Sequence, residues 1–126
     1  ANVVITNPTH YAVALKYDDD GPRAPVVVAK GKGEIAQRIR KLAAEHNVVT
    51  FSAPPLARAI YASTEIDSEI PAQLYLAVAQ VLAYVYQLKL PVVPGQPSPQ
   101  PPTDIPIPNE LSVPEDNDID TNGENP

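Results

Sequence analysis

The chain contains no cysteine, so disulfide bonds and thiolate metal sites are excluded. Its two histidines, His10 and His46, are far apart in the sequence and make a poor start for a zinc site. No apolar run is long enough to cross a bilayer, because the longest, residues 74–88, is interrupted by Gln80 and Gln87 and falls short of the roughly 20 residues required. No signal peptide is visible. We expect no metal and no other cofactor.

Lysine and arginine are absent from residues 91–126, which hold seven of the fifteen acidic residues and ten of the sixteen prolines. Residues 1–90 are close to neutral, so the net charge of −6 comes from this end of the chain. A segment of such composition buries little apolar surface, which cannot offset the entropy lost on ordering. We therefore predict one folded domain over residues 1–90 and a Pro-rich, acidic, disordered tail with polyproline character over residues 91–126.

The folded part has the pattern of an α/β protein. We predict a single small mixed β-sheet of about four strands surrounded by helices. The expected strands are residues 2–6, 10–17, 25–30 and 48–52, and the expected helices are residues 34–46, 54–62 and 71–89. A helical crossover through residues 34–46 would make the strands at 25–30 and 48–52 parallel.

Two of the helices have informative faces. In the helix at 34–46, the apolar residues Ile35, Ile39, Leu42 and Ala43 fall on one face, which predicts that this face packs on the sheet. The helix at 71–89 is almost entirely apolar apart from a narrow stripe of glutamines, and we expect it to be buried on most sides.

The turn between the first two strands contains Asn7-Pro8. Proline has no N–H, so the common route of asparagine ageing, attack by the next amide nitrogen, is closed. In the remaining route the Asn7 side-chain nitrogen attacks its own main-chain carbonyl, forms a succinimide and expels the Pro8 nitrogen. A tight turn that holds the two groups in near-attack geometry would favour this cleavage. Most Asn-Pro pairs, however, are simply turn residues.

The cleavage route needs help from neighbouring groups. An oxyanion on the Asn7 carbonyl would need donors, for which the main-chain N–H and hydroxyl of Thr9 and the imidazole of His10 are candidates. Proton transfer to the leaving nitrogen is a task for a histidine or a water molecule. Whether His10 acts as base, acid or spectator stays open.

Four collinear segments resemble one protein family. "NPTH" at 7–10, "APVVVAKGKGEIAQRIRKLAAEHNV" at 24–48, "APPLARAIY" at 53–61 and "EIPAQLYLAVAQVLAYVYQLK" at 69–89 are similar to the cytoplasmic domain of the FlhB/YscU family. These are membrane proteins of type III export that switch substrate specificity, and "APPLARAIY" is more similar to their flagellar branch. The resemblance covers essentially all of residues 1–90.

The resemblance implies a role for each residue of the turn. Asn7 would cyclise, Pro8 would become a new N-terminus, and Thr9 and His10 would tune the turn. The event would occur once per molecule, so the chain is not an enzyme in the ordinary sense. In the family, cleavage accompanies the change from early hook- or needle-type substrates to late filament-type ones.

The resemblance also implies a location and partners. The chain starts abruptly at its first strand, and we expect it to be the cytoplasmic part of an inner-membrane protein whose transmembrane helices and linker precede residue 1. The expected partners are other export-apparatus proteins, early hook- or rod-type export signals and a hook-length control protein. Contact with the membrane is expected only through the N-terminal region, and no nucleic-acid partner is expected.

A second candidate site combines a loop with the last helix. Ala24 and Pro25 follow the acidic loop, while Ala79 and Leu82 share a flank of the helix three residues apart. Small apolar residues so placed would form a shallow pocket for an apolar side chain of an export signal. The alternative is that Ala79 and Leu82 are ordinary core residues.

Other readings are weaker. The basic residues of the helix at 34–46 do not share a face and lack interleaved aromatics, so a nucleic-acid surface is disfavoured. A conventional hydrolase lacks a nucleophile motif such as G-x-S-x-G. Arg58 is interpreted as an anchor for a carboxylate or a carbonyl. The main alternative to the self-cleaving switch is a docking platform for export substrates and chaperones, in which Asn7-Pro8 is only a turn.

Overall fold

The four strands and three α-helices follow one another along the chain in the predicted order. The structure is a computed structural model that describes residues 1–8, 10–18, 21, 23–91 and 93–114. Its elements are β1 (Val3–Asn7), β2 (Tyr11–Lys16), β3 (Val26–Lys32), α1 (Glu34–Glu45), β4 (Val49–Ser52), α2 (Pro54–Ser63), the 3-10 helix η1 (Ala72–Leu74), α3 (Tyr75–Leu88) and the 3-10 helix η2 (Asn109–Leu111). The predicted α/β class is confirmed. Within the described residues, no helix has the length and hydropathy needed to cross a membrane.

One mixed sheet of four strands forms the centre of the molecule, in the order β3-β2-β1-β4. β1 pairs antiparallel with β2 and parallel with β4, and β2 pairs antiparallel with β3. β3 and β4 therefore run in the same direction, as predicted, although two strands separate them. β1 is an interior strand, and all five of its residues are buried, as is typical of strands covered on both faces.

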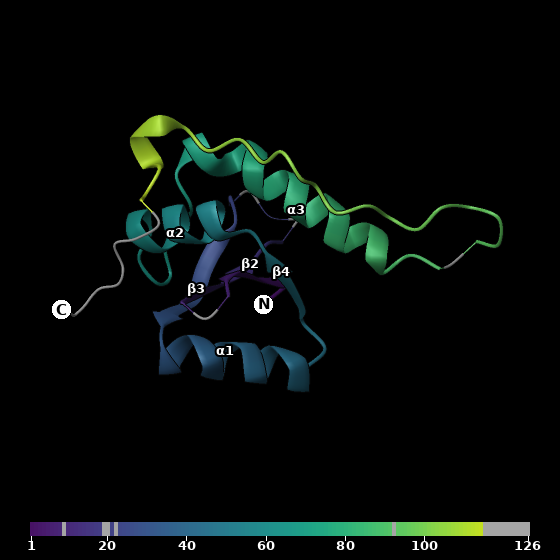
Figure 1. Ribbon diagram of the computed structural model, residues 1–126, viewed down its shortest axis with the longest axis horizontal. Coiled ribbons are helices and arrows are strands. Elements are labelled where there is room, and N and C mark those ends of the chain that lie inside the picture. The colour runs from purple at the N-terminus through teal and green to yellow at the C-terminus, as the bar shows by residue number, and fades with distance from the viewer. Residues whose placement is uncertain (9, 19–20, 22, 92, 115–126) are drawn as a thin grey trace.

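Helices cover both faces of the sheet (Figure 1). On one side lies α1, and on the other lie α2 and α3. Alternate residues of β1 point to opposite faces, so Val3 and Ile5 enter the core beneath α2 and α3 while Val4 enters the core beneath α1. The first core is the larger and contains most of the fully buried large side chains. The sheet is thus packed against an apolar core on each of its two faces.

The predicted inner face of α1 is partly wrong. Ile35 and Leu42 are 59% and 47% exposed, whereas Ala36 and Ala43 are buried against the alanines of β2. Alanines on α1 and on β2 let the helix lie close to the sheet. With the alanines of α1 facing the sheet, Ile35 and Leu42 face outward. The junction is tight as well, because a Cβ on Gly31 would lie 2.1 Å from Cγ2 of Ile35.

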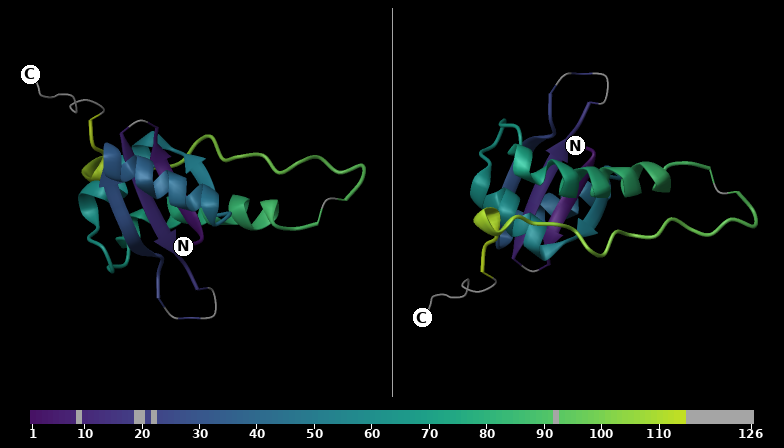
Figure 2. Two further views of the ribbon diagram at one scale, coloured as in Figure 1. Left: turned by 90° about the horizontal axis from the view of Figure 1, so that it is seen from below. Right: turned by 90° about the horizontal axis from the view of Figure 1, so that it is seen from above.

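α3 is less covered than its composition predicted. Ala77, Val78, Val81 and Val85 are buried, but Tyr75, Leu76 and Tyr86 are 47%, 63% and 64% exposed. The prediction of a helix buried on most sides is therefore wrong. Only the buried stripe of α3 enters the core that it shares with α2 and the sheet, and the helix lies along the outer side of the molecule (Figure 2).

The predicted tail has a part that the structure describes and a part outside it. After α3 the chain passes outward and returns alongside α3 to end near α2 (Figures 1 and 2). Ile105, Ile107 and Leu111 are half-buried and pack against the core beneath α2 and α3, a contact that the composition of the segment did not predict. Residues 115–126 lie outside the described residues. The domain boundary at residue 90 stays a prediction.

Candidate functional site

Asn7 is the last residue of β1, at the point where the chain turns into β2. It pairs with Tyr11 across the turn and is only 7% exposed. Pro8 and His10 lie in the turn and are exposed, and Thr9 lies outside the described residues. The Asn7–Pro8 bond therefore joins a buried interior strand to an exposed turn.

Main-chain hydrogen bonds from three elements fix this turn. The His10 N–H donates to the Asn7 carbonyl oxygen at 2.9 Å, which closes the turn. The Gly33 N–H, at the junction of β3 and α1, donates to the His10 carbonyl oxygen at 3.0 Å. The Ala53 N–H, between β4 and α2, donates to the Thr6 carbonyl oxygen at 2.9 Å. The backbone on both sides of the Asn7–Pro8 bond is thus anchored to the sheet and its neighbours.

The Asn7 side chain is buried, and among the described residues its amide has no hydrogen-bond partner. A buried polar group without a partner costs about 1–3 kcal/mol. Within the described part of the chain, no hydrogen bond ties the Asn7 amide to another group, so none has to be broken before its nitrogen can attack. Cyclisation by Asn7 is the chemistry that this arrangement allows.

The donor to the Asn7 carbonyl differs from the predicted candidates. The structure shows the main-chain N–H of His10 in this position, not its imidazole. Any negative charge that develops on the Asn7 carbonyl oxygen would meet this preset donor. The sequence of the turn could have predicted this donor. Asn and Pro are favoured at the first two positions of a β-turn, in which the N–H of the fourth residue often donates to the carbonyl of the first. The predicted role of Thr9 lies outside the described residues.

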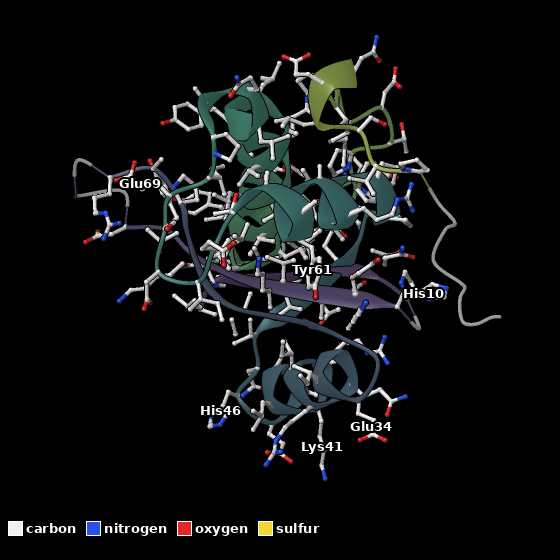
Figure 3. All side chains as sticks on the ribbon, turned by 90° about the vertical axis from the view of Figure 1, so that its left-hand side faces the viewer. His10, Glu34, Lys41, His46, Tyr61 and Glu69 are labelled. Carbon is white, nitrogen blue, oxygen red and sulfur yellow. The ribbon has the colours of Figure 1, made fainter. Side chains whose placement is uncertain are left out.

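The His10 imidazole lies at the exposed end of the β1–β2 hairpin, and its side chain points away from the helices (Figure 3). This position leaves it open to water, through which a proton can be exchanged with the turn. Among the described residues, no group of three or more His, Cys, Asp or Glu side chains is placed to hold a metal ion.

The four residues of the second candidate site line one cavity. Ala24, Pro25, Ala79 and Leu82 all border a cavity of about 640 Å³ between the β2–β3 connection and α3. Ala79 is exposed and Leu82 is half-buried. The interpretation of Ala79 as an ordinary core residue is therefore wrong, whereas Leu82 also packs against the core.

Sequence reasoning missed several other residues of this cavity. Tyr75 and Tyr86 border it from α3, and Arg23 and Glu69 border it from the loops. The Arg23 Nε donates to Glu69 Oε2 at 3.1 Å, which joins two walls of the cavity. The spacing of Tyr75, Ala79, Leu82 and Tyr86 at intervals of three and four residues places them on one flank of α3 and was visible in the sequence.

Comparison with known proteins places the chain in a family. Residues 1–85 match the model of the FlhB HrpN YscU SpaS family. The chain belongs to this family. It is 56% identical over 111 residues to the flagellar biosynthetic protein FlhB of Salmonella typhimurium, and the match covers 88% of this chain and 29% of that protein. This similarity places it on the flagellar branch.

Other relatives differ in how much of the chain they match. FlhB of Bacillus subtilis is 52% identical over 89 residues, which are 71% of this chain and 25% of that protein. The chain thus spans less than a third of these curated relatives. The longer match to the Salmonella protein, 111 residues, extends beyond residues 1–90 into the segment that follows α3.

Solved structures share the fold. The cytoplasmic domain of FlhB from Shewanella putrefaciens superposes with a TM-score of 0.76 at 45% identity, covering 90% of this chain and 88% of that one. The EscU C-terminal domain with an Asn-to-Ala substitution superposes with a TM-score of 0.66 at 29% identity, covering 71% of this chain and 89% of that one. A further EscU structure carries a substitution of the Pro directly after that Asn.

Proposed function

We propose that this chain is the cytoplasmic part of a flagellar type III export membrane protein that cleaves its own Asn7–Pro8 bond once and thereby changes which substrates are exported. The observation that carries the proposal is the turn itself. Asn7 combines a buried side-chain amide without a hydrogen-bond partner among the described residues with a main-chain carbonyl that the His10 N–H already binds. The flagellar relatives and the Shewanella cytoplasmic domain support the export setting.

The proposed step is an intramolecular cyclisation. The Asn7 Nδ2 attacks the Asn7 carbonyl carbon, and the negative charge on the carbonyl oxygen is stabilised by the His10 N–H. The bond from that carbon to the Pro8 nitrogen then breaks. The nitrogen of Asn7 loses a proton and the leaving Pro8 nitrogen gains one, through water or the exposed imidazole. The products are a succinimide at residue 7, which water hydrolyses, and a secondary amine at Pro8.

The sheet retains most of its contacts after this step. β1 stays paired with β2 on one side and β4 on the other. Pro8 has no N–H, so its release from Asn7 removes no hydrogen-bond donor from the ladder. The cleaved protein is therefore expected to keep its fold, with a changed turn on its surface.

The test is the mass of the denatured chain, measured for the wild type and for Asn7→Ala. We expect the wild type to separate into a peptide that ends at residue 7 and a fragment that starts at Pro8, while Asn7→Ala stays intact. Asparagine and isoasparagine termini on the short peptide would identify the succinimide route. If both proteins remain one chain after prolonged incubation at mildly alkaline pH, the self-cleavage proposal is wrong.

A docking role for the cavity is supported by a separate observation, since all four predicted residues border the same space. We propose that an apolar side chain of an early rod- or hook-type export signal binds there. Further proposed partners are other export-apparatus proteins and a hook-length control protein, at the cytoplasmic face of the bacterial inner membrane. If Asn7–Pro8 proves uncleaved, docking of substrates and chaperones is the function that remains.

A further inference from the structure

Residues 105–113, the strap, return to the folded domain after an excursion of the chain. Ile105, Ile107 and Leu111 are half-buried against the core beneath α2 and α3. The returning chain runs back toward α2, and the strap ends near that helix (Figures 1 and 2). Proline at 106 and 108 restricts the backbone to extended conformations, which lowers the entropy lost when the strap binds.

Arg58 of α2 fastens the end of the strap. Its side chain is 9% exposed, and its Nε donates to the Val113 carbonyl oxygen at 3.0 Å. The prediction that Arg58 anchors a carboxylate or a carbonyl is confirmed for the carbonyl. No carboxylate among the described residues forms an ion pair with Arg58, and within that part of the chain its buried guanidinium is matched by one neutral acceptor.

Contributions of opposite sign act on the contact between Arg58 and the strap. A hydrogen bond from a charged donor stabilises the bound strap. Burial of the guanidinium opposes binding, and release of the strap returns Arg58 to water. Three half-buried apolar side chains must also offset the ordering of the segment that joins the strap to α3. These opposing contributions favour an equilibrium between a bound and a released strap.

The strap and the cavity use different flanks of α3. The cavity is bordered by Tyr75, Ala79 and Tyr86, and no strap residue borders it. On the opposite flank, Gln80 and Tyr84 are half-buried four residues apart, and Tyr84 packs with the strap residues against the same core. Release of the strap would therefore expose a second apolar surface without opening the cavity.

We propose that the surface formed by α2 and α3 is a binding site for an extended apolar segment, and that the strap is its exchangeable occupant. The site recognises apolar side chains at the first, third and seventh positions of the segment, and a main-chain carbonyl at the ninth, which Arg58 binds. The strap fills the site within the same molecule and excludes other segments of this kind. This goes beyond the proposed function and does not depend on cleavage at Asn7.

Hydrogen exchange on the full-length wild-type protein tests whether the strap is released. The N–H groups of Leu111 and Ser112, bonded within η2, should exchange through a local opening. We expect their protection to be at least a hundredfold below that of the β1 amides under native conditions. Protection equal to that of β1 would make the strap an integral part of the fold and overturn the proposal.

A labelled synthetic peptide of residues 103–114 tests exchange directly. The receptor is the full-length chain with Ile105→Asp, Ile107→Asp and Leu111→Asp, which vacates the site without truncation. We expect this variant to bind the peptide, and the wild type to bind it at least tenfold more weakly because its tethered strap competes at an effective concentration of the order of millimolar. A peptide with Asp in place of Ile105 should not bind.

Arg58→Gln, added to the vacated variant, should weaken peptide binding about tenfold or more, since it removes a charged donor. Arg38→Gln on the exposed surface of α1 is the matched control and should leave binding unchanged. Failure of the vacated variant to bind the peptide, equal binding by the wild type, or loss of the cooperative fold in the vacated variant would each overturn the proposal.

Discussion

The turn at Asn7 and the cavity beside α3 lie at opposite ends of the same strand. Asn7 ends β1, while Asn2, just before β1, borders the cavity. Five residues of extended strand span roughly 17 Å. Figure 3 shows the same separation, with His10 and Glu69 at opposite sides of the molecule. The two candidate sites therefore lie near opposite ends of β1 and have no residue in common.

The two regions are built in different ways. The turn is made of contiguous residues on an interior strand and is fixed by main-chain bonds from Gly33 and Ala53. The cavity is made of side chains from segments distant in sequence, several of them exposed. A reaction within one residue depends on a fixed backbone, whereas recognition of a partner depends on accessible apolar surface. Variants in one region should therefore leave the other intact.

The largest contrast is expected between two variants of His10. His10→Pro removes the N–H that binds the Asn7 carbonyl, and cleavage should slow by roughly 10²–10³-fold, as for other lost oxyanion donors. His10→Ala keeps this N–H and should cleave much faster than His10→Pro. The rates follow from denatured mass spectra over time, and thermal unfolding confirms that both variants fold. Equal rates far below that of the wild type would assign the main role to the imidazole, and equal rates close to that of the wild type would exclude both groups.

Ala79→Asp tests the other region. The variant places a charge in the cavity, where an apolar ligand would leave it without a partner. Binding of a fluorescent early export-signal peptide should fall at least tenfold, while cleavage at Asn7 and the unfolding temperature remain close to wild type. Ala44→Asp, on an exposed position of α1, is the matched control. Wild-type peptide binding by Ala79→Asp would exclude the cavity as the docking site.

A smaller effect is expected from Gly33→Ala. Gly33 has φ 59° and ψ −127°, a conformation that alanine rarely adopts, and its N–H holds the His10 carbonyl. Strain of about 1–3 kcal/mol should lower the free energy of unfolding, and a displaced turn should slow cleavage a few-fold. Gly95 also has a positive φ, of 87°, but lies far from the turn in an exposed segment. Gly95→Ala should leave the cleavage rate unchanged. If both variants slowed cleavage equally, the conformation of Gly33 would have no specific role in positioning the turn.

The sequence predicted local features well and contacts between distant segments less well. Every strand was found within two residues of its ends, because β-branched runs and turn residues are local signals. Asn7 and Pro8 were located for the same reason. The outward positions of Ile35 and Leu42 were missed, because they depend on how closely α1 approaches the alanines of the sheet.

The strap shows the limit of composition as a guide. Averaged over the Pro-rich and acidic segment, the apolar content is low, and this average concealed the contribution of Ile105, Ile107 and Leu111. Arg58 was the useful clue. A charged residue within an apolar helix indicated an anchor, although the sequence did not say which part of the chain it holds.

The most direct test of the account is to record native and denatured mass spectra of the same wild-type sample. We predict one native species that contains both pieces, and two denatured species divided between Asn7 and Pro8. That result would mean that the turn is cleaved while β2 and β4 still hold β1 in the sheet. A single intact chain under denaturing conditions, or loss of the short peptide under native conditions, would contradict the account.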